Sequence, residues 1–254
     1  MSREAKGLNG KIRVGIGGWT FEPWRGSFYP RGLAQKRELE FASRALTSIE
    51  INGTYYSTFK PDSWRKWRDQ TPDGFVFAIK ASRYCTNRKL LADSGKAIDK
   101  FLGQGLTLLG DKLGPINWQF MATKKFEPGD FAAFLALLPN KKDGIALRHA
   151  VEVRHPSFAH KAFYDLARAH GVAIVYAVDE TFPEIDQRTA DFTYARLMSS
   201  GENLKTGVTD HKLKALVKRC SAWAKRGDVF AYFISGAKIR NPAAAQALIQ
   251  KLNA

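Results

Sequence analysis

Short hydrophobic runs alternate along this chain with longer segments in which apolar residues recur at helical spacing. Eight runs have the length and composition of buried strands, at about 13–18, 48–52, 75–80, 115–120, 150–154, 173–179, 192–197 and 229–235. Helical patterns separate them, with the clearest at about 33–45, 93–103, 158–170, 210–225 and 241–252. Alternation of this kind predicts right-handed β-α-β units and a parallel sheet. Eight units predict a single (β/α)8 TIM-like barrel, with a doubly wound open sheet as the alternative.

The length of 254 residues fits one such barrel, which typically has about 250 residues. We see no internal repeat or linker, so we predict an N-terminal tail at 1–11 and one barrel domain at 12–254. No apolar stretch approaches the roughly 20 residues that cross a bilayer, and no targeting core is visible. We therefore expect a cytoplasmic protein without a membrane partner. The sequence leaves the oligomeric state open.

Motifs for cofactors and metals are missing from the pattern. Gly15, Gly17 and Gly18 follow the first strand, but their spacing fails the dinucleotide fingerprint. Cys85 and Cys220 are far apart and fit no metal or redox spacing. The five histidines do not supply a converging ligand set, so we expect no cofactor and no dedicated metal centre.

Several short motifs together resemble one known group of proteins. They are Gly17-Gly18-Trp19, Trp24-Arg25-Gly26, Phe28-Tyr29-Pro30, Glu50-Ile51-Asn52, Thr54-Tyr55-Tyr56, Phe77 to Tyr84, Leu113-Gly114-Pro115 and Val151 to His155. On these residues the chain resembles the YecE-like family (bacterial domain of unknown function seventy-two), over about 12–252. The resemblance implies a β/α barrel but no particular reaction, because this family has no settled one. The chain departs from the family after Gln119, and again at 233–238, where the family often has paired asparagines.

Polar side chains end the predicted strands. Residues two apart in a strand share a face, which places Glu50 with Asn52 and Glu152 with Arg154. The carboxyl ends of parallel barrel strands meet at one mouth, where the active sites of such barrels lie. We therefore predict that the following residues converge there: Glu50, Asn52, Lys80, Arg83, Glu152, Arg154 and Arg196.

Three of these residues are predicted to be catalytic. Glu50 and Glu152 come from strands two and five, and paired carboxylates can serve as acid and base. The alternative is that each glutamate only balances a nearby cation. Lys80, if partly buried, can act as a base or a Schiff-base nucleophile, or simply bind an anion. If Glu152 is catalytic, Glu152→Gln should abolish turnover and leave folding nearly intact.

Other strand-end residues are predicted to bind substrate. Arginine side chains offer planar forks for carboxylate or phosphate, and aromatic rings can stack on a sugar or a base. Aromatic side chains at such positions also serve often as lids packed on the barrel rim. The predicted substrate-binding residues are Trp19, Asn52, Tyr55, Arg83, Arg154, His155, Asp179 and Arg196.

The net charge of +16 favours a small anionic ligand and would permit weak, non-specific binding to nucleic acid. The other interpretation is a solvated basic surface, because many lysines lie on what look like the outer faces of the predicted helices. We predict an enzyme, for example a hydrolase or lyase, that applies acid–base chemistry to a small anionic or sugar-like substrate. Two alternatives remain open: a nucleic-acid-binding or nuclease-like barrel, and a non-catalytic ligand-binding barrel. Lysines gathered at the mouth would favour nucleic acid, and lysines spread over the outer helices would favour the small substrate.

Overall fold

The computed structural model describes residues 10–179 and 181–254 and contains the predicted parallel sheet. All eight predicted strands are present, and the sixth is divided into two parts, β8 and β9. Their bounds are β1 (Ile12–Gly17), β2 (Ser48–Ile51), β3 (Val76–Lys80), β4 (Leu113–Gln119), β7 (His149–Glu152), β8 (Ala173–Ile174), β9 (Tyr176–Val178), β10 (Thr193–Leu197) and β11 (Val229–Phe233). The hydrogen-bonded order is β8-β7-β4-β3-β2-β1-β11-β10-β9, and every pair of neighbours is parallel.

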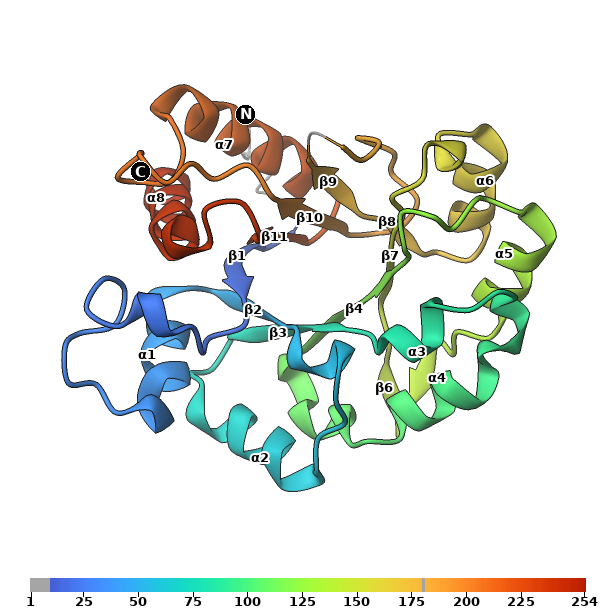
Figure 1. Ribbon diagram of the computed structural model, residues 1–254, viewed down its shortest axis with the longest axis horizontal. Coiled ribbons are helices and arrows are strands. Elements are labelled where there is room, and N and C mark those ends of the chain that lie inside the picture. Colours follow the sequence, from blue (N-terminus) through green and yellow to red (C-terminus); the bar gives the residue numbers. More distant parts are fainter. Residues whose placement is uncertain (1–9, 180) are drawn as a thin grey trace, which may run out of the picture.

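The two ends of this order belong to one strand. β8 and β9 follow each other in the chain and are separated only by Val175, whose N–H donates to the carbonyl of Val151 at 3.0 Å. The first half of the strand pairs with β7 and the second half with β10. The sheet therefore closes on itself through strand six, as a (β/α)8 TIM-like barrel does (Figure 1).

Helices surround the strands (Figure 1). They are α1 (Glu38–Ala45), α2 (Pro61–Gln70), α3 (Arg83–Thr86), α4 (Gly95–Leu102), α5 (Pro128–Ala136), α6 (Lys161–Ala169), α7 (Asp210–Ala224) and α8 (Asn241–Leu252). Local signals set their starts. A proline lies in the first turn of α2, α5 and α8, and Thr209 caps α7 by accepting from the N–H of Lys212 at 3.3 Å.

The structure departs from strict alternation at strand six. Between β9 and β10, the described residues 181–192 contain no helix, so strand six returns to strand seven through irregular chain. The helix predicted from 158 begins instead at Lys161, because His160 caps it there and accepts from the N–H of Ala162 at 3.1 Å. The sequence analysis also missed a small antiparallel hairpin of β5 (Lys141–Lys142) and β6 (Ile145–Ala146).

The barrel interior is apolar toward the amino ends of the strands. Phe192, Tyr194, Phe230 and Tyr232 fill it and are all buried. Arg148 lies at that end, with its guanidinium 4.8 Å from the centre of the Phe230 ring. Its Nη1 also pairs with Asp228 at 2.9 Å. The interior is thus packed at the amino end, which leaves the polar side chains at the carboxyl end.

The predicted tail at 1–11 lies mostly outside the described residues, which begin at Gly10. In the part of the chain that is described, no helix is both long and apolar enough to cross a membrane.

Candidate active site

A cavity of about 700 Å³ opens at the carboxyl ends of the barrel strands. Its charged lining residues are all cations: Lys80, Arg154, Arg196 and Lys238. Aromatic side chains from the loops after β1 and β2 and from α2 form one wall: Trp19, Tyr55, Tyr56, Phe59 and Trp67. The cavity therefore combines positive charge with flat apolar surfaces.

Arg196 is the centre of the buried charge network. It ends up inside the barrel because it shares a strand face with Tyr194, and only 3% of its side chain is exposed. Its Nη1 lies 2.6 Å from Oε2 of Glu152, and its Nη2 lies 3.2 Å from Oε1 of Glu50. Burial lowers the pKa of Arg196, but the two carboxylates outweigh it and the pKa is raised overall. One guanidinium thus joins strands two, five and seven.

Glu152 is fully buried, and both of its oxygens are in use. Oε1 accepts from Arg154 Nε at 2.9 Å and Nη2 at 2.7 Å. Oε2 accepts from Arg196 and from Nδ2 of Asn117 at 3.2 Å. Burial raises the pKa of Glu152, but Arg196, Arg154 and Lys80 outweigh it and lower the pKa to about 2. Glu152 is therefore ionised at neutral pH and serves as the anchor of both arginines.

Glu50 is buried in the same network. Besides its contact with Arg196, its Oε2 accepts a hydrogen bond from the hydroxyl of Tyr194 at 2.5 Å. Burial and the nearby Glu50 raise the pKa of Tyr194 well above its usual value, so this hydroxyl keeps its proton and remains a donor. Both glutamates thus hold the arginines from beneath the cavity.

Lys80 ends β3 and faces the cavity differently. Its Nζ lies 4.2 Å from the centre of the Tyr55 ring. Among the described residues no carboxylate lies within 4.0 Å of it, and Nζ has no hydrogen-bond partner. Burial and then Arg196 lower its pKa to about 8, while the glutamates act in the opposite direction. Lys80 can therefore gain and lose a proton near neutral pH.

The structure brings together most of the residues predicted for the site. Trp19, Asn52, Tyr55, Lys80, Arg154 and Arg196 line the cavity, and Glu50 and Glu152 lie in contact with Arg196 beneath it. Asn52 Oδ1 is buried and has no hydrogen-bond partner among the described residues, so a ligand donor can satisfy it.

Three of the predicted substrate-binding residues lie outside the cavity lining. Arg83 is exposed, with its guanidinium 5.7 Å from the centre of the Tyr56 ring. His155 Nδ1 accepts from the N–H of Ser157 at 3.1 Å, and Asp179 accepts from the N–H of Thr181 at 2.8 Å. His155 and Asp179 stabilise the turns after their strands, and binding roles for all three stay predictions.

Polar groups that sequence reasoning did not assign to the site include Gln119, Asn117 and Lys238. Gln119 lines the cavity and accepts from Arg154 Nη2 at 3.0 Å and from Arg196 Nη1 at 3.3 Å. Asn117 supports Glu152 from β4, and its place two residues before Gln119 on the same strand face was an available signal. Lys238 follows β11, and its Nζ lies 4.1 Å from the centre of the Phe21 ring. It stands at the segment where the chain departs from the family pattern.

Within 10–179 and 181–254, no group of three or more His, Cys, Asp or Glu residues is arranged to bind an ion.

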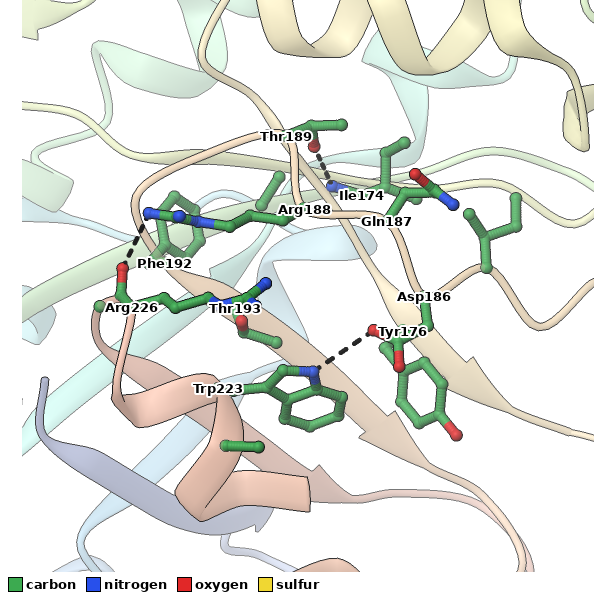
Figure 2. A pocket seen from close by; sticks show the side chains of 14 residues that line it. Ile174, Tyr176, Asp186, Gln187, Arg188, Thr189, Phe192, Thr193, Trp223 and Arg226 are labelled. Atoms are coloured by element: carbon green, nitrogen blue, oxygen red, sulfur yellow. Dashed lines mark hydrogen bonds between the residues drawn. The ribbon is translucent and has the colours of Figure 1, made fainter. Parts of the chain in front are cut away.

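A second cavity of about 330 Å³ lies outside the barrel, beside the helix-free return of strand six (Figure 2). Its polar groups mostly satisfy one another. Arg188 Nη2 donates to the carbonyl of Arg226 at 2.9 Å, and Trp223 Nε1 donates to Asp186 at 3.3 Å. None of the predicted site residues lines it, and we treat it as a gap left by the missing helix.

Comparison with known proteins agrees with this architecture. Residues 13–254 match the family described as "Protein of unknown function DUF72". The UPF0759 protein YecE of Escherichia coli K12 is 29% identical over 150 residues, which is 58% of this chain and 50% of that protein. The alignment thus spans about half the length of that relative.

Two solved structures share the fold. A DUF72 family protein from Thermotoga maritima superposes with a TM-score of 0.75 at 22% identity, covering 95% of this chain and 98% of that one. A DUF72 family protein from Enterococcus faecalis has a TM-score of 0.69 at 15% identity, covering 96% of each chain. At these identities the structures support the fold alone. The family match over residues 13–254 confirms the predicted resemblance, and the chain belongs to the DUF72 family.

Proposed function

We propose that the protein is an enzyme that holds a small anionic or sugar-like substrate at the barrel mouth and moves a proton with Lys80. The observation that carries this proposal is the sign of the charge facing the cavity. The charged lining residues are all cationic, and the two buried glutamates lie beneath them with their oxygens engaged. Three cations (Lys80, Arg154 and Arg196) oppose two carboxylates, which leaves a surplus of one positive charge before Lys238 is added.

Arg154 is well placed to bind the anionic group. Glu152 holds its Nε and Nη2, whereas Nη1 has no partner among the described residues. An arginine held on one edge presents its remaining donors in a fixed direction, which suits carboxylate or phosphate oxygens. The rings of Trp19 and Tyr55 line the same cavity and offer a face for a sugar ring.

The proton-transfer role falls to Lys80 rather than to the glutamates. A general acid or base works best when its pKa is close to the working pH. The pKa of Lys80 is lowered to about 8, while that of Glu152 is lowered to about 2, which makes Glu152 a weak base. The catalytic roles of Glu50 and Glu152, expected from the sequence, stay predictions.

Ligand binding can be tested before any reaction is known. We expect phosphorylated or carboxylated sugars and related small metabolites to raise the melting temperature of the wild type. Arg154→Lys should lose most of this increase, because a single ammonium group cannot both pair with Glu152 and present a separate, fixed donor to the ligand as Arg154 does with Nη1. Arg168→Lys, on the exposed outer face of α6, is the matched control and should keep it.

If no anion stabilises the wild type more than the Arg154 variant, the proposal fails. If anions bind but no incubated compound is converted, the alternative of a non-catalytic ligand-binding barrel takes its place.

The basic surface gives a separate prediction for nucleic acid. Exposed lysines lie along outer helices, for example Lys96 and Lys100 on α4 and Lys212, Lys214 and Lys218 on α7. Such dispersed charge favours the small-substrate proposal over a nucleic-acid groove. We expect oligonucleotide affinity to fall on the order of tenfold or more between 50 and 200 mM salt. Fluorescence anisotropy measures it, and tight, sequence-selective binding that survives salt would instead favour a nucleic-acid function.

A further inference from the structure

The environment of Lys80 suits a nucleophile. A comparison with Lys112, another lysine that is largely removed from solvent, makes the point. Lys112 Nζ donates to the carbonyls of Arg68 at 2.8 Å and Thr71 at 2.6 Å, so its ammonium group is fixed and satisfied. Lys80 Nζ has neither a hydrogen bond nor an ion pair among the described residues, and it lines the mouth cavity. An amine that is sheltered but not held in place is available to react with a ligand.

We propose that the amine of Lys80 forms a covalent imine with the carbonyl carbon of a small aldehyde or ketone that carries an anionic group. This inference rests on the anion site of the proposed function, names the class of its substrate, and gives Lys80 the role of nucleophile in place of the proton transfer proposed above. The anionic group would lie against Arg154, and the carbonyl group would face Lys80 from within the same cavity.

The step is balanced without any further reactant. The lone pair of Nζ attacks the carbonyl carbon, and the electron pair of the C=O bond moves to oxygen, which takes a proton released by the nitrogen. The carbinolamine then loses water as the nitrogen lone pair forms the C=N bond. One amine and one carbonyl compound thus give one imine and one water, and hydrolysis reverses the step.

The surroundings of Lys80 favour the neutral amine that attacks the carbonyl carbon, and they also favour the protonated imine that results. Burial and Arg196 lower the pKa of Lys80 to about 8, so a useful share of the amine is neutral at pH 7 to 8. Once the protonated imine forms, it carries a positive charge. The Tyr55 ring, 4.2 Å from Nζ, and the buried carboxylates of Glu50 and Glu152 then stabilise that charge.

Reductive trapping tests the proposal directly. The full chain would be incubated at pH 7.5 with glyoxylate, pyruvate or pyridoxal 5′-phosphate, each with sodium cyanoborohydride, and the adducts located by peptide mass spectrometry. We expect Lys80 to be modified on the order of tenfold faster than exposed lysines, because far more of its amine is neutral at this pH. Inorganic phosphate should slow the reaction at Lys80 by occupying the cation site, and should leave the exposed lysines unaffected.

Two variants serve as controls. Lys80→Arg keeps the positive charge but cannot form an imine, and should lose the fast adduct while keeping the wild-type circular dichroism spectrum. Lys100→Arg removes an exposed lysine of α4 and should leave the adduct at Lys80 unchanged.

Labelling that spreads evenly over surface lysines, or a fast adduct that persists in Lys80→Arg, would overturn the proposal. If anions stabilise the protein through Arg154 but Lys80 is not trapped, the proposed function survives and the imine is wrong. If Lys80 is trapped but Arg154→Lys changes nothing, the imine holds and the anion site fails.

Discussion

Arg196→Met is expected to lower the free energy of unfolding by about 3–5 kcal/mol. Arg196 is almost fully buried and pairs with Glu50 at 3.2 Å and Glu152 at 2.6 Å. A methionine of similar length would fill the space, but it would leave buried Glu50 without an ion-pair partner and Glu152 with Arg154 alone. Burying an unpaired charge is far more costly than losing a contact at the surface, so the loss should be large. Urea denaturation followed by circular dichroism would measure it.

Two further variants make this prediction specific. Arg65→Met removes an exposed arginine that pairs with Asp62 at 2.8 Å, and should change stability by less than about 1 kcal/mol. Arg196→Lys keeps one positive charge but not the planar fork that reaches both carboxylates, and should fall between Arg196→Met and the wild type. An Arg196→Met protein that unfolds at the wild-type urea concentration would show that the network contributes little to stability.

Glu152→Gln is expected to cost about 3 kcal/mol at pH 7, and the cost should shrink in acid. The folded-state pKa of Glu152 is lowered from 4.5 to about 2. A group whose pKa is depressed by folding stabilises the protein fully above its unfolded value, and this contribution is lost as the pH falls through the folded value. The difference in unfolding free energy between wild type and variant should therefore narrow from about pH 4.5 down to pH 2.

A partly exposed glutamate provides the comparison. Glu40 lies on α1 and pairs with Arg37 at 3.2 Å, and Glu40→Gln should cost less than about 1 kcal/mol at pH 7. A Glu152→Gln protein as stable as the wild type would support the expectation from sequence alone, in which this residue serves catalysis and folding is nearly unaffected. The geometry favours a large loss because both Glu152 oxygens accept from arginines.

The fold was predictable because parallel barrel strands are buried on both faces. Such strands appear in a sequence as short, almost continuous apolar runs, as in Val76–Lys80. The expected alternation of strand and helix failed where the chain returns from strand six without a helix. This expectation predicts a helix between every two consecutive parallel strands, and here there is none. The hairpin at 141–146 was missed because strands of two residues have no measurable periodicity. Its Asp143-Gly144 turn, with φ values of +48° and +81°, was a usable signal.

The alternation of side chains between the two faces of a strand explains which site residues could be placed correctly from the sequence. Glu50, Glu152 and Arg196 point inward because their strand neighbours two positions away do so too. His155 lies beyond the end of β7, and its ring caps the following turn by accepting from the N–H of Ser157 instead of lining the cavity. The sequence could not provide the distances between side chains that come from different strands. Whether a glutamate is free or held by two arginines depends on partners from other strands, and this decides between a catalytic base and an anchor.

The packed amino end of the barrel has a kinetic consequence. Phe192, Tyr194, Phe230 and Tyr232 fill the interior beneath the charge network, so a ligand held at the mouth has no passage through the barrel. Under the proposed function, substrate and product would use the same opening in turn. A product that keeps its anionic group would then remain against Arg154 until it dissociates, and it would exclude the next substrate while it stays. We therefore expect product inhibition of the competitive kind, and a turnover rate that rises in salt if anion release is the slow step.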